Sequence, residues 1–225
     1  MTDKIGVILQ ARMNSSRLPG KVLKPFFHTT LLGWILERLV NLPYQIITAT
    51  SICNQDDAIE DFCLKRGEKC FRGSELNVLD RFYQCAISNQ FVHVIRLTGD
   101  NPFPDEKVIR DITELHISNS ASYTHAFGDL PIGVGCEIIS FQALKHSWEK
   151  AKQPHFKEHV NEFILNNPEY FRIEKLTVSE ENIKPDLSLT IDTEEDYNRI
   201  LGYFKSKPDP KINTKELISE CSSSA

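Results

Sequence analysis

Short apolar runs alternate with segments of helical periodicity through the first 119 residues of the chain. In residues 31–40 the apolar side chains of Leu32, Ile35, Leu36 and Leu39 share one face at the spacing of an α-helix. The same pattern predicts strands over residues 5–11, 44–49, 70–71 and 92–97, and helices over residues 31–40, 56–66, 78–88 and 105–119. Such an alternation is typical of a mostly parallel sheet that is covered by helices on both faces, so it predicts an α/β fold.

The second half of the chain is less regular. Its pattern predicts strands over residues 136–139, 171–178 and 189–191, and helices over residues 142–150, 155–165 and 193–204. Two prolines and a Cys-Ser-Ser-Ser-Ala end then predict a loose C-terminal tail over residues 207–225. Because no linker or internal repeat divides the rest, we expect one domain over residues 1–206.

The composition limits the class of protein. Of the 225 residues, 40% are hydrophobic and 25% charged, and the formal net charge of −5 offers no general basic surface for a nucleic acid. No apolar run approaches the length of a membrane span, and the first four residues lead directly into a predicted strand instead of a signal peptide. The six cysteines contain no C-x-x-C pair. We therefore expect a cytoplasmic protein with no membrane or nucleic-acid partner.

A cationic loop follows the first predicted strand. The stretch Gln10-Ala11-Arg12-Met13-Asn14-Ser15-Ser16-Arg17-Leu18-Pro19-Gly20-Lys21 carries three cations and two serines. It matches neither the P-loop nor the dinucleotide fingerprint. Guanidinium groups, an ammonium and hydroxyls nevertheless suit phosphate oxygens, and Pro19-Gly20 can turn Lys21 back toward Arg12. The loop therefore predicts an anion site, with a plain surface loop as the alternative.

Two aspartates stand at predicted strand ends that are far apart in sequence. Asp100 follows the strand of residues 92–97, and Asp192 follows residues 189–191. Ligands of open α/β sheets bind beyond the carboxyl ends of the strands, and Mg²⁺ prefers one or two carboxylates together with water and phosphate. Both aspartates are therefore candidate metal ligands. Alternatively, Asp100 is a turn or helix cap before Pro102, and Asp192 caps the last helix.

Beyond these general features, several motifs resemble the cytidylyltransferases that activate acidic sugars. This family includes the CMP-Kdo and CMP-sialic acid synthetases, and the similarity is greatest to its SpsF-like branch, which serves spore-coat polysaccharide synthesis. The motifs extend from residue 5 to residue 201, and besides the cationic loop they are Phe71-Arg72-Gly73-Ser74, Val78-Leu79-Asp80-Arg81-Phe82, Arg96-Leu97-Thr98-Gly99-Asp100-Asn101-Pro102, Glu158-His159-Val160 and Thr190-Ile191-Asp192-Thr193-Glu194-Glu195-Asp196.

The resemblance implies a Rossmann-like, three-layer nucleotidyltransferase fold with a mostly parallel mixed sheet, usually dimeric. It implies catalysis for Arg12, Lys21 and Asp100, and Mg²⁺ binding for Asp100 and Asp192. Glu137 and His159 are expected on the acceptor side. The residues expected to bind the nucleotide are Gln10, Ala11, Arg12, Ser15, Ser16, Arg17, Lys21, Arg72 and Gly73. Within the nucleotide group, Arg72 is expected near the base or ribose. For Arg81, in a predicted helix beside Asp80, an internal ion pair and a role in the site stay open.

The activity implied is transfer of CMP from CTP to an acidic or modified sugar, or to a sugar phosphate, with release of pyrophosphate, for surface polysaccharide synthesis. The chain departs from the SpsF-like pattern at Gly133-Val134-Gly135-Cys136-Glu137, where that branch has a Gly-Leu-Asp-Val-Glu type of stretch. This departure leaves the acceptor open. The alternatives are a nucleotidyltransferase that uses another base, a glycosyltransferase, and a catalytically silent nucleotide-binding protein.

Overall fold

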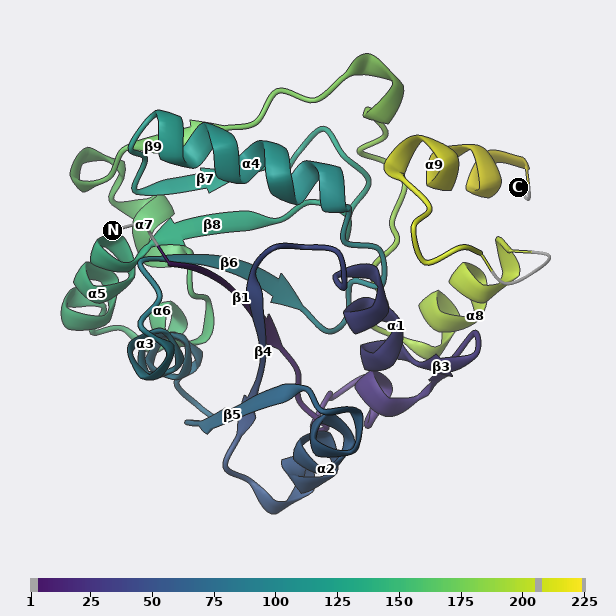
Figure 1. The fold of residues 1–225 in the computed structure, drawn as a ribbon, viewed down its shortest axis with the longest axis horizontal. Coiled ribbons are helices and arrows are strands. Elements are labelled where there is room, and N and C mark those ends of the chain that lie inside the picture. The colour runs from purple at the N-terminus through teal and green to yellow at the C-terminus, as the bar shows by residue number, and fades with distance from the viewer. Residues whose placement is uncertain (1–3, 205–207, 224–225) are drawn as a thin grey trace.

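A mixed sheet of seven strands forms the centre of the protein in a computed structural model, which describes residues 4–204 and 208–223 (Figure 1). The strand order is β5 (Lys69–Gly73), β4 (Gln45–Ser51), β1 (Ile5–Gln10), β6 (His93–Thr98), β8 (Glu137–Ser140), β7 (Tyr123–His125) and β9 (Ile173–Lys175). The first four are parallel to one another, β8 is antiparallel to both of its neighbours, and β7 pairs parallel with β9. The predicted α/β fold with a mostly parallel mixed sheet is confirmed.

Helices cover both faces of this sheet. One face packs against α1 (Leu31–Arg38), α2 (Asp57–Arg66), α4 (Glu106–Ser118), α8 (Glu194–Gly202) and α9 (Thr214–Ser223). The other packs against α3 (Val78–Asn89), α5 (Phe141–Lys150), α6 (Pro154–Glu158) and α7 (Glu162–Asn166). In Figure 1, α3, α5 and α6 lie to the left of the sheet and α1 and α8 to the right. The layers arise because neighbouring strand residues point to opposite faces: Leu9 joins the first core and Ile8 the second.

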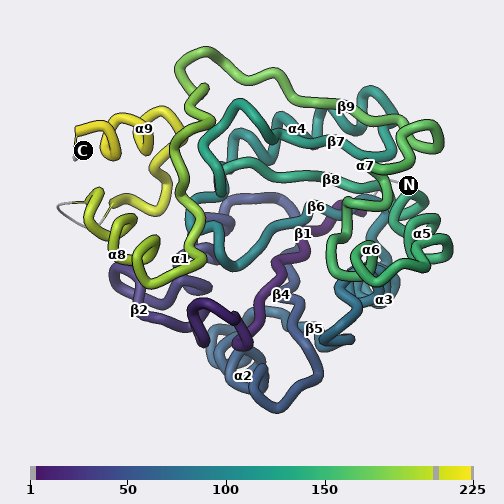
Figure 2. The backbone as a smooth tube through the Cα atoms, turned by 180° about the vertical axis from the view of Figure 1, so that it is seen from behind, coloured from purple at the N-terminus to yellow at the C-terminus, as the bar shows by residue number. Residues whose placement is uncertain are grey.

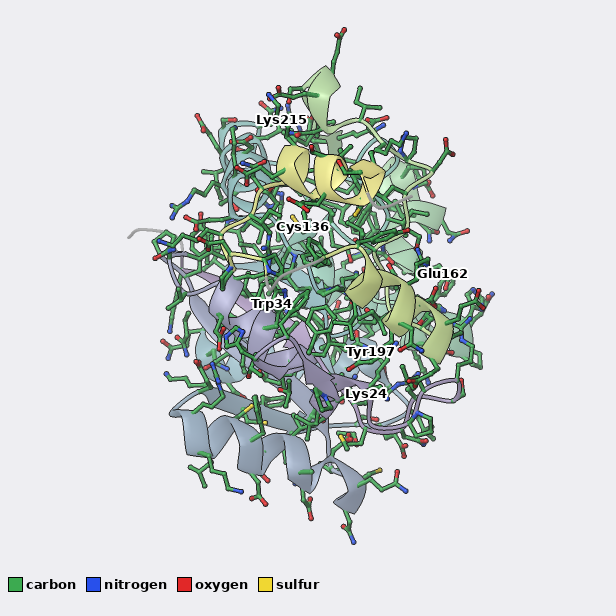
Figure 3. The ribbon with its side chains drawn as sticks, turned by 90° about the vertical axis from the view of Figure 1, so that its right-hand side faces the viewer. Lys24, Trp34, Cys136, Glu162, Tyr197 and Lys215 are labelled. Carbon is green, nitrogen blue, oxygen red and sulfur yellow. The ribbon has the colours of Figure 1, made fainter. Side chains whose placement is uncertain are left out.

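Smaller elements complete the fold. A two-stranded hairpin, β2 (Pro25–Phe26) with β3 (Thr29–Thr30), precedes α1, and short 3₁₀ turns cover Lys21–Leu23, Asn54–Asp56, Pro168–Tyr170 and Glu180–Asn182. The hairpin is joined to α8 because Lys24, just before it, places its ammonium 4.7 Å from the centre of the Tyr197 ring, and the Tyr197 hydroxyl donates to the carbonyl of Pro25. Figure 3 shows Lys24 beside Tyr197, with the buried Trp34 above them.

The second half of the chain differs from the sequence prediction in several elements. The helix expected over residues 155–165 is two short helices, α6 and α7, separated by an extended His159. The strand expected over residues 189–191 is an extended segment next to a single bridge between Ile132 and Ser188. The strand expected over residues 171–178 shortens to β9, and β7 was not predicted because three residues are too few to show a period.

The prediction of a loose tail over residues 207–225 is wrong for the residues that the structure describes there. Residues 214–223 form α9, in which Leu217 is fully buried. Asp105, the N-cap of α4, also accepts hydrogen bonds from the amide and hydroxyl of Thr214, at 2.8 and 2.6 Å. The Arg38 guanidinium donates to the carbonyls of Pro210 and Ile212. These partners lie about 100 residues or more away in sequence, so the local pattern could not show them.

Candidate active site

The cationic loop after β1 is held in one shape by its own backbone. Gly20 adopts a φ of +74°, in the left-handed region that glycine accepts without strain, and its amide donates to the carbonyl of Met13 at 2.8 Å. The amide of Met13 donates in turn to the Asp56 carboxylate at 2.7 Å. The turn at Gly20 directs the next residue, Lys21, back over the end of the sheet. The predicted turn at Pro19-Gly20 is therefore present.

This loop forms a pocket with the ends of two other segments. Besides Val22, the pocket is lined by residues from the loop, from β6 and its following turn, and from the segment before α8, namely Gln10, Ala11, Arg12, Ser15, Ser16, Arg17, Lys21, Arg96, Thr98, Gly99, Asp100 and Asp192. Figure 2 shows the segment before α8 passing beside the loop after β1. The structure thus brings together the predicted triphosphate residues and both predicted metal ligands.

Both aspartates of the pocket converge on one ammonium group. The Lys21 Nζ lies 3.4 Å from an Asp100 oxygen and 3.1 Å from an Asp192 oxygen, and it donates to the carbonyl of Ile191 at 2.8 Å. The Arg17 guanidinium lies 2.8 Å from the other Asp192 oxygen. A backbone hydrogen bond from Ile191 to the carbonyl of Asp100 joins the two segments at 2.8 Å. The centre of the pocket is therefore a position for a cation between two carboxylates.

The structure excludes one of the two interpretations of Asp192, the helix cap. Thr193 is the N-cap of α8, because its hydroxyl accepts from the amide of Asp196, whose carboxylate accepts from the amide of Thr193. The capping box is complete without the carboxylate of Asp192, which instead faces Lys21 and Arg17. Asp100 likewise faces Lys21. It does not cap the following helix α4, because the N-cap of that helix is Asp105. Neither aspartate of the pocket caps a helix with its side chain.

Arg72 and Gly73 do not line this pocket. The Arg72 guanidinium donates to the carboxylates of Asp57 and Glu60 at 2.5 and 2.8 Å, and to the carbonyls of Ser51 and Cys53 at 2.9 and 2.8 Å. These four partners fix β5 against the start of α2, and the ion pairs with Glu60 and Asp57 raise the pKa of Arg72. In this structure Arg72 joins secondary-structure elements, and its expected contact with a base or ribose stays a prediction.

Arg81 is the more unusual arginine of this region. It is 1% exposed, and its Nη1 donates to the carbonyl of Ser74 at 2.9 Å, whereas Nε and Nη2 are buried with no hydrogen-bond partner among the described residues. Burial lowers the pKa of Arg81 to about 10. The neighbouring Asp80 accepts from Gln84 and Trp148, so the alternative of an Asp80–Arg81 ion pair finds no support among the contacts of the described residues.

The two acceptor-side residues differ in accessibility. His159 is exposed in the break between α6 and α7. Glu137 is fully buried, and both of its carboxylate oxygens are engaged by Arg96, Tyr123 and Asn161. Direct contact of Glu137 with an acceptor is therefore excluded in this structure, because no part of its side chain is accessible. Arg96 stands in one of the motifs but was not predicted as a site residue, although a guanidinium between the apolar Ile95 and Leu97 was a signal.

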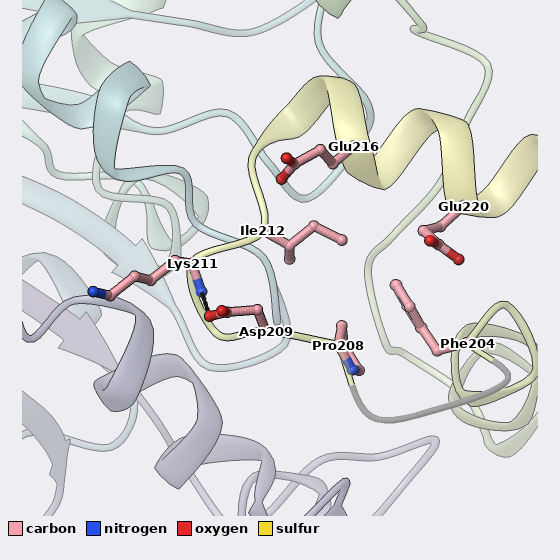
Figure 4. Close-up of a pocket in the computed structure, with 7 residues that line it drawn as sticks. All are labelled: Phe204, Pro208, Asp209, Lys211, Ile212, Glu216 and Glu220. Atoms are coloured by element: carbon pink, nitrogen blue, oxygen red, sulfur yellow. Dashed lines mark hydrogen bonds between the residues drawn. The ribbon is translucent and has the colours of Figure 1, made fainter.

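A second pocket lies between α8 and α9 and offers a poor fit to a polyphosphate. Figure 4 shows its lining, which includes the carboxylates of Asp209, Glu216 and Glu220 with one lysine, Lys211. An excess of negative charge repels phosphate. No motif residue lines this pocket among the described residues. The pocket at the end of β1 is therefore the candidate active site.

Comparison with known proteins gives the family. The family model described as "Cytidylyltransferase" matches residues 6–216. The chain belongs to the cytidylyltransferase family. It is thus a nucleotidyltransferase, as the motif resemblance implied, and the family assignment is confirmed. No helix in the described part of the chain is long and apolar enough to cross a membrane.

Individual relatives cover nearly the whole chain. The spore coat polysaccharide biosynthesis protein SpsF of Bacillus subtilis is 36% identical over 220 residues, which are 94% of this chain and 91% of SpsF. A cytidylyltransferase structure from Leptospira borgpetersenii has a TM-score of 0.92 at 30% identity, covering 98% of this chain and 94% of that one. A CMP:2-keto-3-deoxy-manno-octonic acid synthetase, solved with CTP, has a TM-score of 0.67 at 15% identity, covering 88% and 97%.

Proposed function

We propose that this cytidylyltransferase transfers CMP from CTP to an acidic or modified sugar, with release of pyrophosphate and with Mg²⁺ as the metal. The observation that carries the proposal is the group of three cations and two aspartates at the ends of β1, β6 and the segment before α8. The polysaccharide context comes from the name of the SpsF relative. A cytoplasmic location and a homodimer stay predictions.

The cations of the loop are suited to hold the triphosphate. CTP carries about four negative charges, and each phosphate oxygen accepts strong hydrogen bonds from charged donors. Arg12 and Arg17 are exposed in the pocket, and Ser16 offers a hydroxyl beside them. An acceptor hydroxyl or phosphate would attack the α-phosphorus, and pyrophosphate would leave while these cations keep its charge compensated. Catalysis would then rest on positioning and charge neutralisation.

The aspartates are suited to hold the metal. Asp100 and Asp192 already surround one cation, the ammonium of Lys21, and two carboxylates are the protein ligands that Mg²⁺ commonly takes when phosphate oxygens and water fill the other positions. No cluster of three or more metal-ligating side chains occurs in the part of the chain that the structure describes. The metal, when bound there, supplies positive charge to the phosphate oxygens.

Lys21 and Arg17 must change partners for this arrangement to form. Their carboxylate partners are part-exposed, so these ion pairs are weak and can be exchanged. Phosphate oxygens then take the place of the carboxylates around Lys21 and Arg17. We therefore expect nucleotide and metal to bind together more tightly than either alone.

A thermal-shift experiment tests the nucleotide. Binding to the native state raises the melting temperature, so CTP with Mg²⁺ should stabilise the protein more than ATP, GTP or UTP with Mg²⁺. Lys21→Ala serves as the binding-site variant and should lose most of this shift. Equal shifts with all four nucleotides would reduce the proposal to triphosphate binding, and no shift with any of them would contradict it.

A further inference from the structure

A buried carboxylate stands beside the candidate active site without touching it. Glu137 opens β8, pairs in register with Arg96 on β6 and with His125 on β7, and is fully buried. Its Oε1 accepts from Arg96 Nη1 at 2.5 Å. Its Oε2 accepts from the Tyr123 hydroxyl and from Asn161 Nδ2, the latter at 2.8 Å. A carboxylate without solvent is stable only when it is paired and hydrogen-bonded, and here both oxygens are satisfied.

The three partners of Glu137 come from separate parts of the fold. Tyr123 lies on β7, and Asn161 lies in the break between α6 and α7, beside the exposed His159. The Asn161 amide also donates to the Tyr123 hydroxyl at 3.3 Å. The network therefore fixes both the guanidinium of Arg96 and the segment that the sequence assigns to the acceptor side.

Arg96 reaches the pocket from this network. Its side chain is 17% exposed and lines the same pocket as Thr98 and Asp100. Its guanidinium lies 5.9 Å from the centre of the Phe82 ring, and its Nε is buried with no hydrogen-bond partner among the described residues. With Nη1 held by Glu137, the guanidinium has a fixed orientation; Nε is buried, so the Nη groups are the donors left to contact a ligand.

The position of Arg96 separates it from the triphosphate cations. The cations of the loop follow β1, on one side of β6, whereas Arg96 is held from β8, on the other side. Three cations already serve the triphosphate, and the two aspartates serve the metal. A fixed fourth cation, held from β8 and not part of the loop, matches an anionic group on the second substrate.

We propose that Arg96 binds the anionic group of the acceptor sugar, and that Glu137, Tyr123 and Asn161 are positioning residues for it. This inference rests on the proposed function and makes the acceptor an anionic sugar. A guanidinium pairs with a carboxylate or a phosphate through two parallel hydrogen bonds, so the shared chemistry is a planar or tetrahedral oxyanion. Arg96 thereby selects a charged acceptor over a neutral one.

Calorimetric titration of an acceptor into the nucleotide-loaded protein tests the proposal. The full chain is loaded with Mg²⁺ and a CTP analogue whose α–β bridging oxygen is replaced by methylene. The probes are 3-deoxy-manno-octulosonate, its neutral carboxamide and glucose 1-phosphate. At least one anionic probe should bind about 10- to 100-fold more tightly than the carboxamide, as expected for charge-assisted hydrogen bonds. Whichever anion binds more tightly identifies the acceptor group as a carboxylate or a phosphate.

Variants at Arg96 and Glu137 complete the test. Arg96→Gln should abolish the preference for the anionic probe while the affinity for the CTP analogue stays within about twofold. Arg96→Lys should retain part of the preference, because the ammonium keeps the charge but not the two parallel donors of the guanidinium. Glu137→Gln should weaken the anionic probe and not the analogue, and in steady state should raise the acceptor KM with little change in kcat. Arg110→Gln on α4, which breaks a surface pair with Glu106, is the matched control.

Two results would overturn the inference. One is equal or absent binding of the anionic and neutral probes to wild-type protein that binds the CTP analogue. The other is a loss of analogue affinity in Arg96→Gln as large as the loss of acceptor affinity, which would place Arg96 with the nucleotide. A wild-type protein that does not bind the analogue at all contradicts the proposed function itself, so the two failures are distinguishable.

Discussion

Two kinds of ion pair meet at the candidate active site, and they differ in the accessibility of the carboxylate. The strand-end pairs join Lys21 and Arg17 to Asp100 and Asp192, whose side chains are 31% and 37% exposed. The buried pair joins Arg96 to Glu137, whose side chain is 0% exposed. Asp100 follows β6, Asp192 lies in the segment before α8, and Glu137 opens β8 opposite Arg96 near the end of β6, so the difference comes from the packing around them.

The accessibility of the carboxylate sets how easily the paired cation can change partners. A part-exposed pair contributes little to stability, because water and salt screen it, and an incoming phosphate can replace the carboxylate. A buried pair cannot be separated without leaving a charge that has neither water nor partner. We infer that the strand-end pairs keep the charges ready for nucleotide and metal, whereas the Arg96–Glu137 pair holds one donor in a fixed orientation.

The largest expected effect concerns the stability of the protein without ligands. Glu137→Ala leaves the guanidinium of Arg96 largely buried and unpaired, so the free energy of unfolding should fall by about 3–5 kcal/mol. Asp192→Ala breaks only part-exposed pairs and should cost about 1 kcal/mol or less. Urea unfolding of both variants measures the contrast.

The double variant Arg96→Met with Glu137→Leu sharpens this result. Replacing a buried pair by apolar side chains of similar volume is often neutral in stability, so the double variant should recover most of the loss seen in Glu137→Ala. Equal unfolding free energies for Glu137→Ala and Asp192→Ala would remove the distinction between the two kinds of pair.

The second prediction concerns the rate of pyrophosphate release. Asp100→Asn and Asp192→Asn keep the size of the side chain and remove the charge proposed to hold the metal. Each should lower the rate by about 100-fold or more at limiting Mg²⁺, the scale seen when one preorganised electrostatic group is removed from a site. Because Thr193 and not Asp192 caps α8, both variants should fold with nearly normal stability.

A magnesium titration is the measurement that decides this second prediction. Each variant should regain part of its rate at high Mg²⁺, since a weakened site still fills at a higher concentration. A near-normal rate for Asp192→Asn at low Mg²⁺ would leave Asp100 to hold the metal with phosphate oxygens and water.

The smallest expected effect concerns the metal alone. Lys21→Met removes the ammonium that lies between Asp100 and Asp192. The nucleotide-free variant should bind Mn²⁺, used as a spectroscopic probe, about 10-fold more tightly than the wild type, because one competing charge is gone and Asp100 loses its ion-pair partner, while Asp192 keeps its pair with Arg17. Electron paramagnetic resonance of free Mn²⁺ measures the change. Unchanged Mn²⁺ affinity would show that the ammonium does not occupy the metal position.

The N-terminal half of the fold could be predicted from local patterns. The runs around Val7 and Val94 are apolar on both faces, as expected for strands inside a parallel sheet, and the segment from Leu31 shows a clear helical face. The cationic loop was visible because its charges lie within twelve residues that follow a strand. Its turn followed from Gly20, the residue type that accepts a positive φ.

Tertiary structure decided which charged residues meet. From the sequence, Asp192 was either a helix cap or a metal ligand. In the structure Thr193 is the N-cap of α8, because its hydroxyl closes the capping box. The sequence placed Arg72 at the nucleotide, whereas four partners on β4, on α2 and in the segment between them engage that guanidinium in the structure. Charge and position along a strand do not show which neighbour a long side chain will reach.

The sequence by itself determined the alternation of strands and helices, the cationic character of the loop and the family, because each depends on residues that are close together in the chain. Only the tertiary structure decided that Glu137 is buried, that Arg96 enters the pocket, and that Thr214 at the start of α9 donates to Asp105, the N-cap of α4. Each of these depends on contacts between distant segments, since burial and pairing free energies arise from the final packing and not from the local pattern.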